Sequence, residues 1–231
     1  MARKSTAKKT RRTTSAKAPT ATTPREKIVA AFMELLSEKR FENIDLGDIA
    51  EAADVTLAQL RDEFDGKLAI LSAYLKQIDR AVLAGGSADM AEESPRDRLF
   101  DVLMRRIDAM TPYRAAIESL MRSATRNPGL ALALNSLAVR TQQWMLTAAG
   151  ISAAGPKGML RAQGLALMFA GVVRTFVGDD EDNARTMAAL DRALERGQRW
   201  SGILDDVCRM VPRPGRRRRR RARYEDDMEA A

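Results

Sequence analysis

The placement of proline constrains the fold of this 231-residue chain more than any other feature. Five of the eight prolines follow a residue that can cap a helix, and the pairs are Thr23-Pro24, Ser94-Pro95, Thr111-Pro112, Asn127-Pro128 and the weaker Gly155-Pro156. Proline suits the first helical position because its missing N–H would have no partner there. No segment shows the sustained alternation of a strand together with β-branched enrichment. The sequence therefore predicts an all-α fold.

Apolar periodicity between these starts predicts about nine helices. The expected ranges are 24–39, 46–53, 57–63, 67–84, 95–110, 112–125, 128–149, 156–177 and 182–210. The first range opens with a capping box, in which Thr23 and Glu26 satisfy each other's backbone N–H groups.

Basic charge is concentrated at the two ends of the chain. Residues 1–22 hold seven Lys/Arg and no acid, and residues 212–231 hold eight Arg, six of them consecutive at 216–221. Neither segment has enough large apolar side chains to form a core, so both are expected to be disordered tails. Residues 25–80, by contrast, carry twelve acids and eight bases.

The residue inventory excludes most catalytic chemistry. Histidine is absent, which removes imidazole bases, His-containing triads and most zinc sites. No carboxylate pair stands out either, so we expect neither an enzyme nor a metal site or cofactor. Cys208 is the single cysteine, and neither an export signal nor an apolar run long enough for a membrane span is present. These features indicate a cytoplasmic protein.

Two short helices near the N-terminus are predicted to form a helix-turn-helix. The preceding helix buries Ile28, Val29, Phe32, Leu35 and Leu36, and Phe41 and Ile44 close the core beneath it. Asp45 caps the second helix, which turns Ile49 and Ala52 inward. Asp54 takes the left-handed conformation in the turn, and Thr56 caps a third helix expected to bury Leu57, Leu60 and Phe64.

The stretch REKIVAAFMELLSEKRFENIDLGDIAEAADVTLAQLRDEFDGKLAIL resembles the DNA-binding domain of TetR-family transcriptional regulators and covers about a fifth of the chain. The matching features are the apolar first helix, F-x-x-I, DIAEAA, V-T before the third helix, and a hydrophobic residue followed by x-x-x-F-x-x-K. In that family the third helix lies in the DNA major groove, and a lysine opening the fourth helix lies near a phosphate.

Carried over by position, the resemblance implies that Thr56, Leu57, Ala58, Gln59 and Arg61 face DNA and that Lys67 lies near a phosphate. Gln59 is the best candidate base reader. Arg61 replaces a family tyrosine, and Glu63 replaces a histidine and would repel phosphate.

The net charge of −4 over residues 25–80 opposes DNA binding, which depends on phosphate neutralisation. The basic arm with Arg11 and Arg12 could offset it by reaching a minor groove. A head that keeps this fold without reading DNA remains an alternative.

Residues 69–211, after the head at 23–68, are expected to form a ligand-binding and dimerisation domain. Methionine and aromatic residues there suit either a plain core or an adaptable pocket for an apolar small-molecule effector. The candidate pocket residues are Met104, Trp144, Met145, Met168 and Phe169. By resemblance, the last two helices would form a homodimeric four-helix bundle, and the small apolar segment 164–171 suits close helix contact.

The layout of residues 142–192 is also similar to TetR-fold, lipid-binding accessory proteins of ubiquinone biosynthesis, which no longer bind DNA. An apolar stripe that includes Trp200, Ile203 and Leu204, followed by Arg216–Arg221, could contact an anionic membrane surface. A third possibility is sequence-blind DNA binding through the tails alone. The favoured hypothesis is a TetR-like regulator that binds double-stranded DNA as a homodimer.

Overall fold

The structure is a computed structural model that describes residues 23–86, 90 and 92–210, with only the backbone described for 198–210. Its helices are α1 (Pro24–Glu38), α2 (Leu46–Ala52), α3 (Leu57–Glu63), α4 (Lys67–Ala84), α5 (Pro95–Met110), α6 (Arg114–Ala124), α7 (Pro128–Ala148), α8 (Gly155–Phe176) and α9 (Ala184–Met210). A short 3-10 turn, η1 (Phe41–Asn43), lies between α1 and α2, and another, η3 (Thr111–Tyr113), lies between α5 and α6. The described residues contain no strand, which confirms the predicted all-α class.

Side-chain caps begin several helices where the sequence predicted them. Thr23 and Glu26 form the expected capping box at α1. The hydroxyl of Ser94 accepts the Asp97 N–H at the start of α5, and the amide oxygen of Asn127 accepts the Leu130 N–H at the start of α7. The starts of these three helices are therefore encoded within four residues, whereas α4, α6 and α8 begin without a side-chain cap.

The predicted helix start at Thr111-Pro112 is wrong. These residues form η3, and α6 begins only at Arg114. The Thr111 hydroxyl donates to the Ile107 carbonyl at 3.1 Å, so it satisfies the last turn of α5 instead of capping the next helix.

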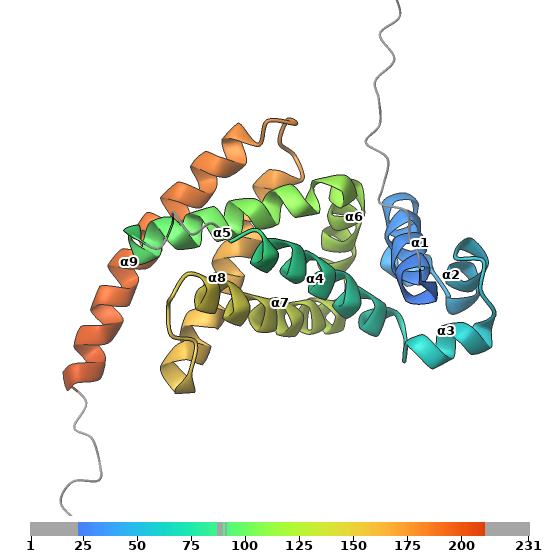
Figure 1. Cartoon of the computed structure of the whole chain (residues 1–231), viewed down its shortest axis with the longest axis horizontal. Helices are drawn as coiled ribbons and strands as arrows, with labels where there is room; N and C mark the ends of the chain where they lie inside the picture. The colour runs from blue at the N-terminus through green and yellow to red at the C-terminus, as the bar shows by residue number, and fades with distance from the viewer. Residues whose placement is uncertain (1–22, 87–89, 91, 211–231) are drawn as a thin grey trace, which may run out of the picture.

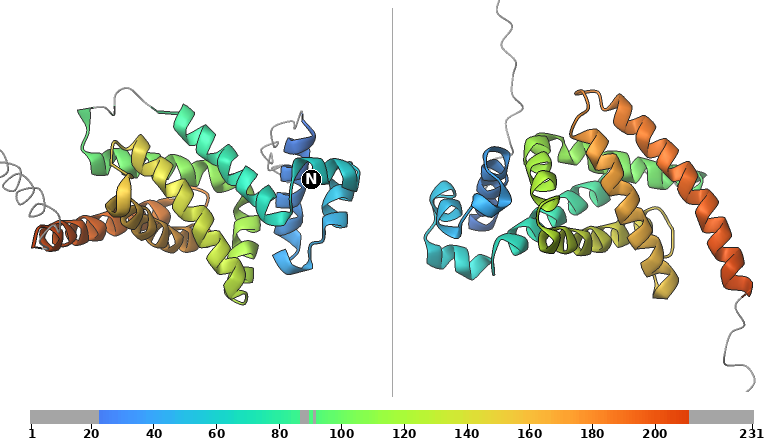
Figure 2. Two further views of the ribbon diagram at one scale, coloured as in Figure 1. Left: turned by 90° about the horizontal axis from the view of Figure 1, so that it is seen from below. Right: turned by 180° about the vertical axis from the view of Figure 1, so that it is seen from behind.

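Helices α1, α2 and α3 form a head at one side of the molecule, and α5 to α9 form a helical body at the other (Figure 1). Helix α4 leaves α3 and runs into the body, while α6 packs along α1. The same separation of head and body is visible in both views of Figure 2. Two helices thus connect the parts, α4 by chain continuity and α6 by packing.

The head core is largely the predicted one, with Ile28, Phe32 and Leu36 fully buried. Two expectations for this core are wrong. Leu57 is 59% exposed because the inner face of α3 is occupied by Leu60. Ala52 is also exposed, and its neighbours Ala50 and Ala53 are buried instead.

We expect Gly158→Ala to destabilise the fold strongly. A Cβ at this buried position would lie 2.1 Å from the backbone carbonyl carbon of Ala153, so the loop between α7 and α8 would have to move. The free energy of unfolding should fall by about 1–3 kcal/mol in urea denaturation. Gly197→Ala is the matched control, because a Cβ there meets nothing within 4 Å. That variant should be unchanged or stabilised by up to about 1 kcal/mol, and equal losses in both variants would contradict the steric argument.

Candidate functional site

Helices α2 and α3 are joined by a tight turn that gives the predicted helix-turn-helix. Asp54 takes a positive φ of 55° in this turn, as expected. The Val55 N–H donates to the Ala50 carbonyl at 3.0 Å, which closes the turn onto α2. Thr56 caps α3 through a capping box with Gln59. The turn and the cap together fix the direction in which α3 leaves the head.

The outer face of α3 carries the predicted DNA-facing residues. Thr56, Leu57, Ala58, Gln59 and Arg61 are all exposed, whereas Leu60 on the opposite side is 2% exposed. The helix is therefore amphipathic in the sense that a groove-binding helix requires: one side is anchored in the core and the other is available to a partner.

Ion pairs change the electrostatics expected around α3. Glu63, which the sequence indicated as repulsive to phosphate, pairs with Arg25 of α1 at 3.1 Å. The same guanidinium donates to the Glu63 carbonyl at 2.8 Å and lies over the Phe64 ring, 4.2 Å from its centroid. Arg61 pairs with Asp65 at 2.9 Å, and both side chains are highly exposed. The Arg61 pair is therefore weak and can exchange for another anion.

Lys67 turns inward at the start of α4. Its ammonium donates to the carbonyls of Phe41 at 2.8 Å and Ile44 at 2.6 Å, and lies 4.5 Å from the centroid of the Phe41 ring. Burial lowers the pKa of Lys67, opposed by the nearby carboxylates of Glu42 and Asp45. Two of the three ammonium N–H donors of Lys67 are therefore engaged within the head, which leaves one donor for a phosphate.

Helix α6 holds the same loop from the body side. The Ser119 hydroxyl donates to the Lys39 carbonyl at 2.9 Å, and the Phe41 N–H donates to the Ser123 hydroxyl at 3.2 Å. Both serines are buried, at 4% and 2% exposure. The loop between α1 and α2 is thus bonded to α4 and to α6 at once.

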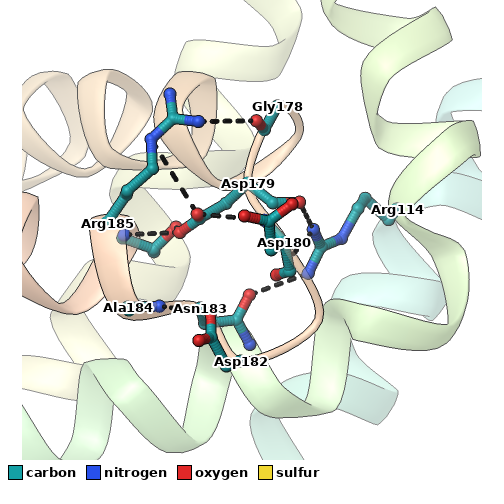
Figure 3. A network of polar contacts seen from close by, with 9 residues as sticks. Arg114, Gly178, Asp179, Asp180, Asp182, Asn183, Ala184 and Arg185 are labelled. Atoms are coloured by element: carbon teal, nitrogen blue, oxygen red, sulfur yellow. Dashed lines mark hydrogen bonds and ion pairs between the residues drawn. The ribbon is translucent and has the colours of Figure 1, made fainter.

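At its other end, α6 is attached to the loop between α8 and α9 (Figure 3). Arg114 donates to the carbonyls of Asp179 and Asp180 and, at 2.7 Å, to the side-chain oxygen of Asn183. Its guanidinium also lies 4.4 Å from the centroid of the Phe176 ring. One short helix therefore connects the head loop with the turn that orients α9.

The α8–α9 loop is itself held by Asp179. One oxygen of this carboxylate accepts both the N–H and the hydroxyl of Thr186, each at 2.6 Å. These bonds from Thr186 lower the pKa of Asp179, with smaller effects from Asp180 and Arg185. The carboxylate thus stays charged and fixes the first turn of α9.

The five predicted pocket residues differ in their burial. Met145 and Phe169 are buried, while Met104 and Met168 are partly buried against the same core. Trp144 is 59% exposed and lines a shallow hollow of about 640 Å³ at the end of α7. The structure therefore separates Trp144 from the four other candidates.

A polar cluster lies inside the body between α4, α5 and α7. Arg106 and Asp79 form an ion pair in which the Arg106 side chain is 3% exposed. Thr141 donates its hydroxyl to Asp79 at 3.4 Å, and the Phe169 ring centroid lies 6.0 Å from the guanidinium carbon. The Tyr74 hydroxyl is buried with no hydrogen-bond partner among the described residues. A buried hydroxyl without a hydrogen bond lowers the free energy of unfolding by about 1–3 kcal/mol.

Several predicted residues lie outside the described part. They are Arg11, Arg12 and Arg216–Arg221, and the side chains of Trp200, Ile203 and Leu204. Among the residues that the structure does describe, no helix is long and apolar enough to cross a membrane, and no group of His, Cys, Asp or Glu could hold a metal ion.

No protein-family model matches this chain, and no curated protein matches it significantly in sequence. Solved structures do match in fold. A TetR transcriptional regulator from Nitrosomonas europaea ATCC 19718 is 23% identical, with a TM-score of 0.58, and the match covers 74% of this chain and 96% of that one. A putative TetR-family regulator from Rhodococcus sp. is 19% identical over 74% of this chain and 97% of that one, with a TM-score of 0.53.

A third structure, a TetR transcriptional regulator from Rhodococcus sp. RHA1, is 22% identical, with a TM-score of 0.51 and 74% and 94% of the two chains covered. These matches confirm the expected likeness at the level of the fold: the chain has the all-α fold of the TetR-family transcriptional regulators. Fold alone does not decide what a site binds.

We expect Lys67→Ala to loosen the head from the body. The carbonyls of Phe41 and Ile44 would lose their shared donor, so the free energy of unfolding should fall by about 1–3 kcal/mol. Hydrogen exchange measured by mass spectrometry should accelerate in the peptide covering residues 39–44. Lys76→Ala, at an exposed position of the same helix, should leave this peptide unchanged. Equal exchange in the two variants would show that the ammonium does not hold the loop.

Proposed function

We propose that this protein is a homodimeric transcriptional regulator that binds double-stranded DNA and is controlled by an apolar small-molecule effector. The observation that carries the proposal is the third helix: α3 is anchored by buried Leu60 and presents Thr56, Leu57, Gln59 and Arg61 outward. The fold supports the same reading, since the solved structures that share it are titled as transcriptional regulators.

Sequence readout rests on a few side chains of α3. The Gln59 Oε1 accepts the Thr56 N–H at 2.8 Å, so its amide NH₂ group is the part that can donate to a base. Arg61 can exchange its exposed partner Asp65 for a guanine edge or a phosphate. Leu57 presents an apolar surface that suits a thymine methyl group.

Binding to DNA has to overcome the net negative charge of the head. Pairing with Arg25 partly neutralises Glu63, the carboxylate expected to repel phosphate, but the segment still carries more acids than bases. The arm before Thr23, with Arg11 and Arg12, supplies the missing positive charge. Such an arm joins the head at α1 and can follow an adjacent minor groove.

Dimerisation is proposed through α8 and α9. Leu160, Gly164, Leu167 and Gly171 share one face of α8 at a spacing of three to four residues, and both leucines are more than half exposed. A Cβ at either glycine would meet nothing within 4 Å, so this face is open to a second helix. Met187 of α9 is 48% exposed as well. A two-fold dimer would present two heads to two half-sites.

Effector control requires a physical connection between body and head. Helix α6 supplies one, with Arg114 on the α8–α9 loop at one end and Ser119 and Ser123 on the head loop at the other. Helix α4 supplies a second through Lys67. A ligand that shifts α4 or α6 in the body would therefore re-aim α3, and its differential affinity for the two arrangements would set the response.

A regulator of this kind acts in the cytoplasm, where DNA is accessible. The rival lipid-binding hypothesis rests on Trp200, Ile203, Leu204 and Arg216–Arg221, whose side chains lie outside the described residues. No contact in the described part favours that rival over DNA recognition.

A random-DNA selection tests the proposal most directly. The full-length protein and a chain trimmed to residues 23–211 should enrich the same sequence, because α3 reads bases while the tails contribute affinity. The trimmed chain should bind more weakly and with a smaller salt dependence. Failure of the full-length protein to enrich any site would refute the regulator, and binding that is then lost on trimming would indicate sequence-blind binding through the tails.

We expect Gln59→Ala to weaken preference for the selected site by about 5- to 150-fold, which corresponds to the roughly 1–3 kcal/mol of one specific base contact. Since Gln59 also closes the capping box of α3, Gln59→Glu is the matched control for stability. Glutamate keeps the accepting oxygen but not the NH₂ donor. Electrophoretic mobility shift with specific and scrambled DNA should show lost preference in both variants. Retained preference in Gln59→Glu would exclude the amide as base reader.

Leu167→Glu should convert the dimer into monomer, because it places a charge in the exposed apolar face of α8. Sedimentation velocity at micromolar concentration measures the change directly. The control is Leu46→Glu, an exposed leucine in the head at 40% exposure, which should leave the dimer intact. A Leu167→Glu variant that remains dimeric would place the interface elsewhere.

A further inference from the structure

The phenol of Tyr74 is a polar group with an unmet hydrogen bond inside the body. The residue is 3% exposed, and its hydroxyl has no partner among the described residues. Its ring packs edge-on against Tyr113 of η3, with centroids 5.4 Å apart. Burial raises the pKa of Tyr74 far above its ordinary value, so the group is a neutral O–H donor at physiological pH. It can therefore serve an oxygen acceptor brought in by a ligand.

The charged groups beside it are already paired. Arg106 and Asp79 neutralise each other, and Thr141 adds a hydrogen bond to the second oxygen of Asp79. Because Arg106 and Asp79 already neutralise each other, an incoming carboxylate or ammonium would be desolvated here without a free counter-ion, and an uncharged polar group avoids that cost. This centre selects for an uncharged polar group.

The walls around the centre are adaptable. Met110 follows Arg106 by four residues on α5, and Met145 follows Thr141 by four residues on α7, so each lies one turn away on the same helix face. Both methionines are buried, and the Phe169 ring borders Arg106 from α8. Thioether side chains repack at small cost, so they can yield space to an apolar guest.

We propose that Tyr74 anchors the effector through its hydroxyl and that the effector is an uncharged, largely apolar molecule with one carbonyl or hydroxyl oxygen. This inference rests on the proposed function, because it names the ligand class of the regulator's body. It also replaces exposed Trp144 with the interior residues Tyr74, Met110 and Met145 as the centre of recognition. The guest lies between α4, α5 and α7, of which α4 carries Lys67 at its head end.

Thermal unfolding of the full-length protein without DNA tests the ligand class. The probes are three matched sets: cyclohexanone, cyclohexanol and cyclohexanecarboxylate; acetophenone, benzyl alcohol and benzoate; and nonanone, nonanol and nonanoate. In at least one set the ketone or alcohol should raise Tm by about 2–5 °C at saturating concentration, and the carboxylate should not. Tyr74→Phe should abolish the shift, because it removes only the donor oxygen.

Tyr113→Phe is the matched control, since it removes a hydroxyl from the half-buried ring that packs against Tyr74 and should keep the shift. A second measurement does not depend on the Tyr74→Phe variant folding well. In wild-type protein with carbon-13-labelled tyrosine rings, the active probe should change the NMR chemical shift of Tyr74.

A shift produced by a carboxylate, an equal shift in Tyr74→Phe, or no shift with any probe would each overturn the proposal. No shift with any probe would indicate that an internal water accepts the hydrogen bond of the phenol. Because these measurements use no DNA, failure here leaves sequence reading by α3 standing, and failure of the DNA selection leaves this ligand site standing.

Discussion

The loop between α1 and α2 is the constraint on which the arrangement of this molecule depends. Its carbonyls at Lys39, Phe41 and Ile44 point inward, and the side chains that satisfy them come from other elements: Ser119 of α6 for the first and Lys67 of α4 for the other two. Buried carbonyls have to be bonded, so the head cannot rotate freely on the body without breaking these contacts. The orientation of α3 is therefore set by two helices that belong largely to the body.

The interior of the body shows the same dependence on polar contacts. A buried ion pair such as Arg106 with Asp79 seldom contributes more to the free energy of folding than well-packed apolar residues of equal volume would. What the pair adds is specificity for one packing arrangement, because a misplaced helix would leave a buried charge without its partner. Here the pair fixes α4 against α5, and Thr141 extends it to α7. Helix α4 also carries Tyr74, whose buried hydroxyl has no partner among the described residues, so the same helix combines a fixed ion pair with an open hydrogen-bonding position.

Local chemistry made much of this structure predictable from sequence. Caps such as Thr23, Asp45, Thr56 and Asn127 act within four residues, so the helix starts follow from the chain itself. Long-range contacts are not encoded in this way. Periodicity alone could not show that Leu57 faces solvent or that the Lys67 ammonium points into the head. It also could not show that the serines of α6 bond to a loop some 80 residues earlier in the sequence. The tight spacing of residues 53–56 predicted the turn. No sequence pattern predicted the contacts of Arg114 or the unpaired hydroxyl of Tyr74.

The acidic composition of the head weighs less against DNA binding once its carboxylates are placed. Asp45 and Asp48 cap α2, and the hydrogen bond from the Asp45 N–H, together with Lys39, holds the pKa of Asp48 below its usual value. Glu63 is paired with Arg25, whereas Asp65 loses its partner when Arg61 turns to DNA. Among the described residues of α3, this leaves Asp62 as the acid without an ion pair. The net charge thus overstates the repulsion a phosphate would meet at α3. What the head lacks is attraction, which depends on cations supplied from outside the helix-turn-helix.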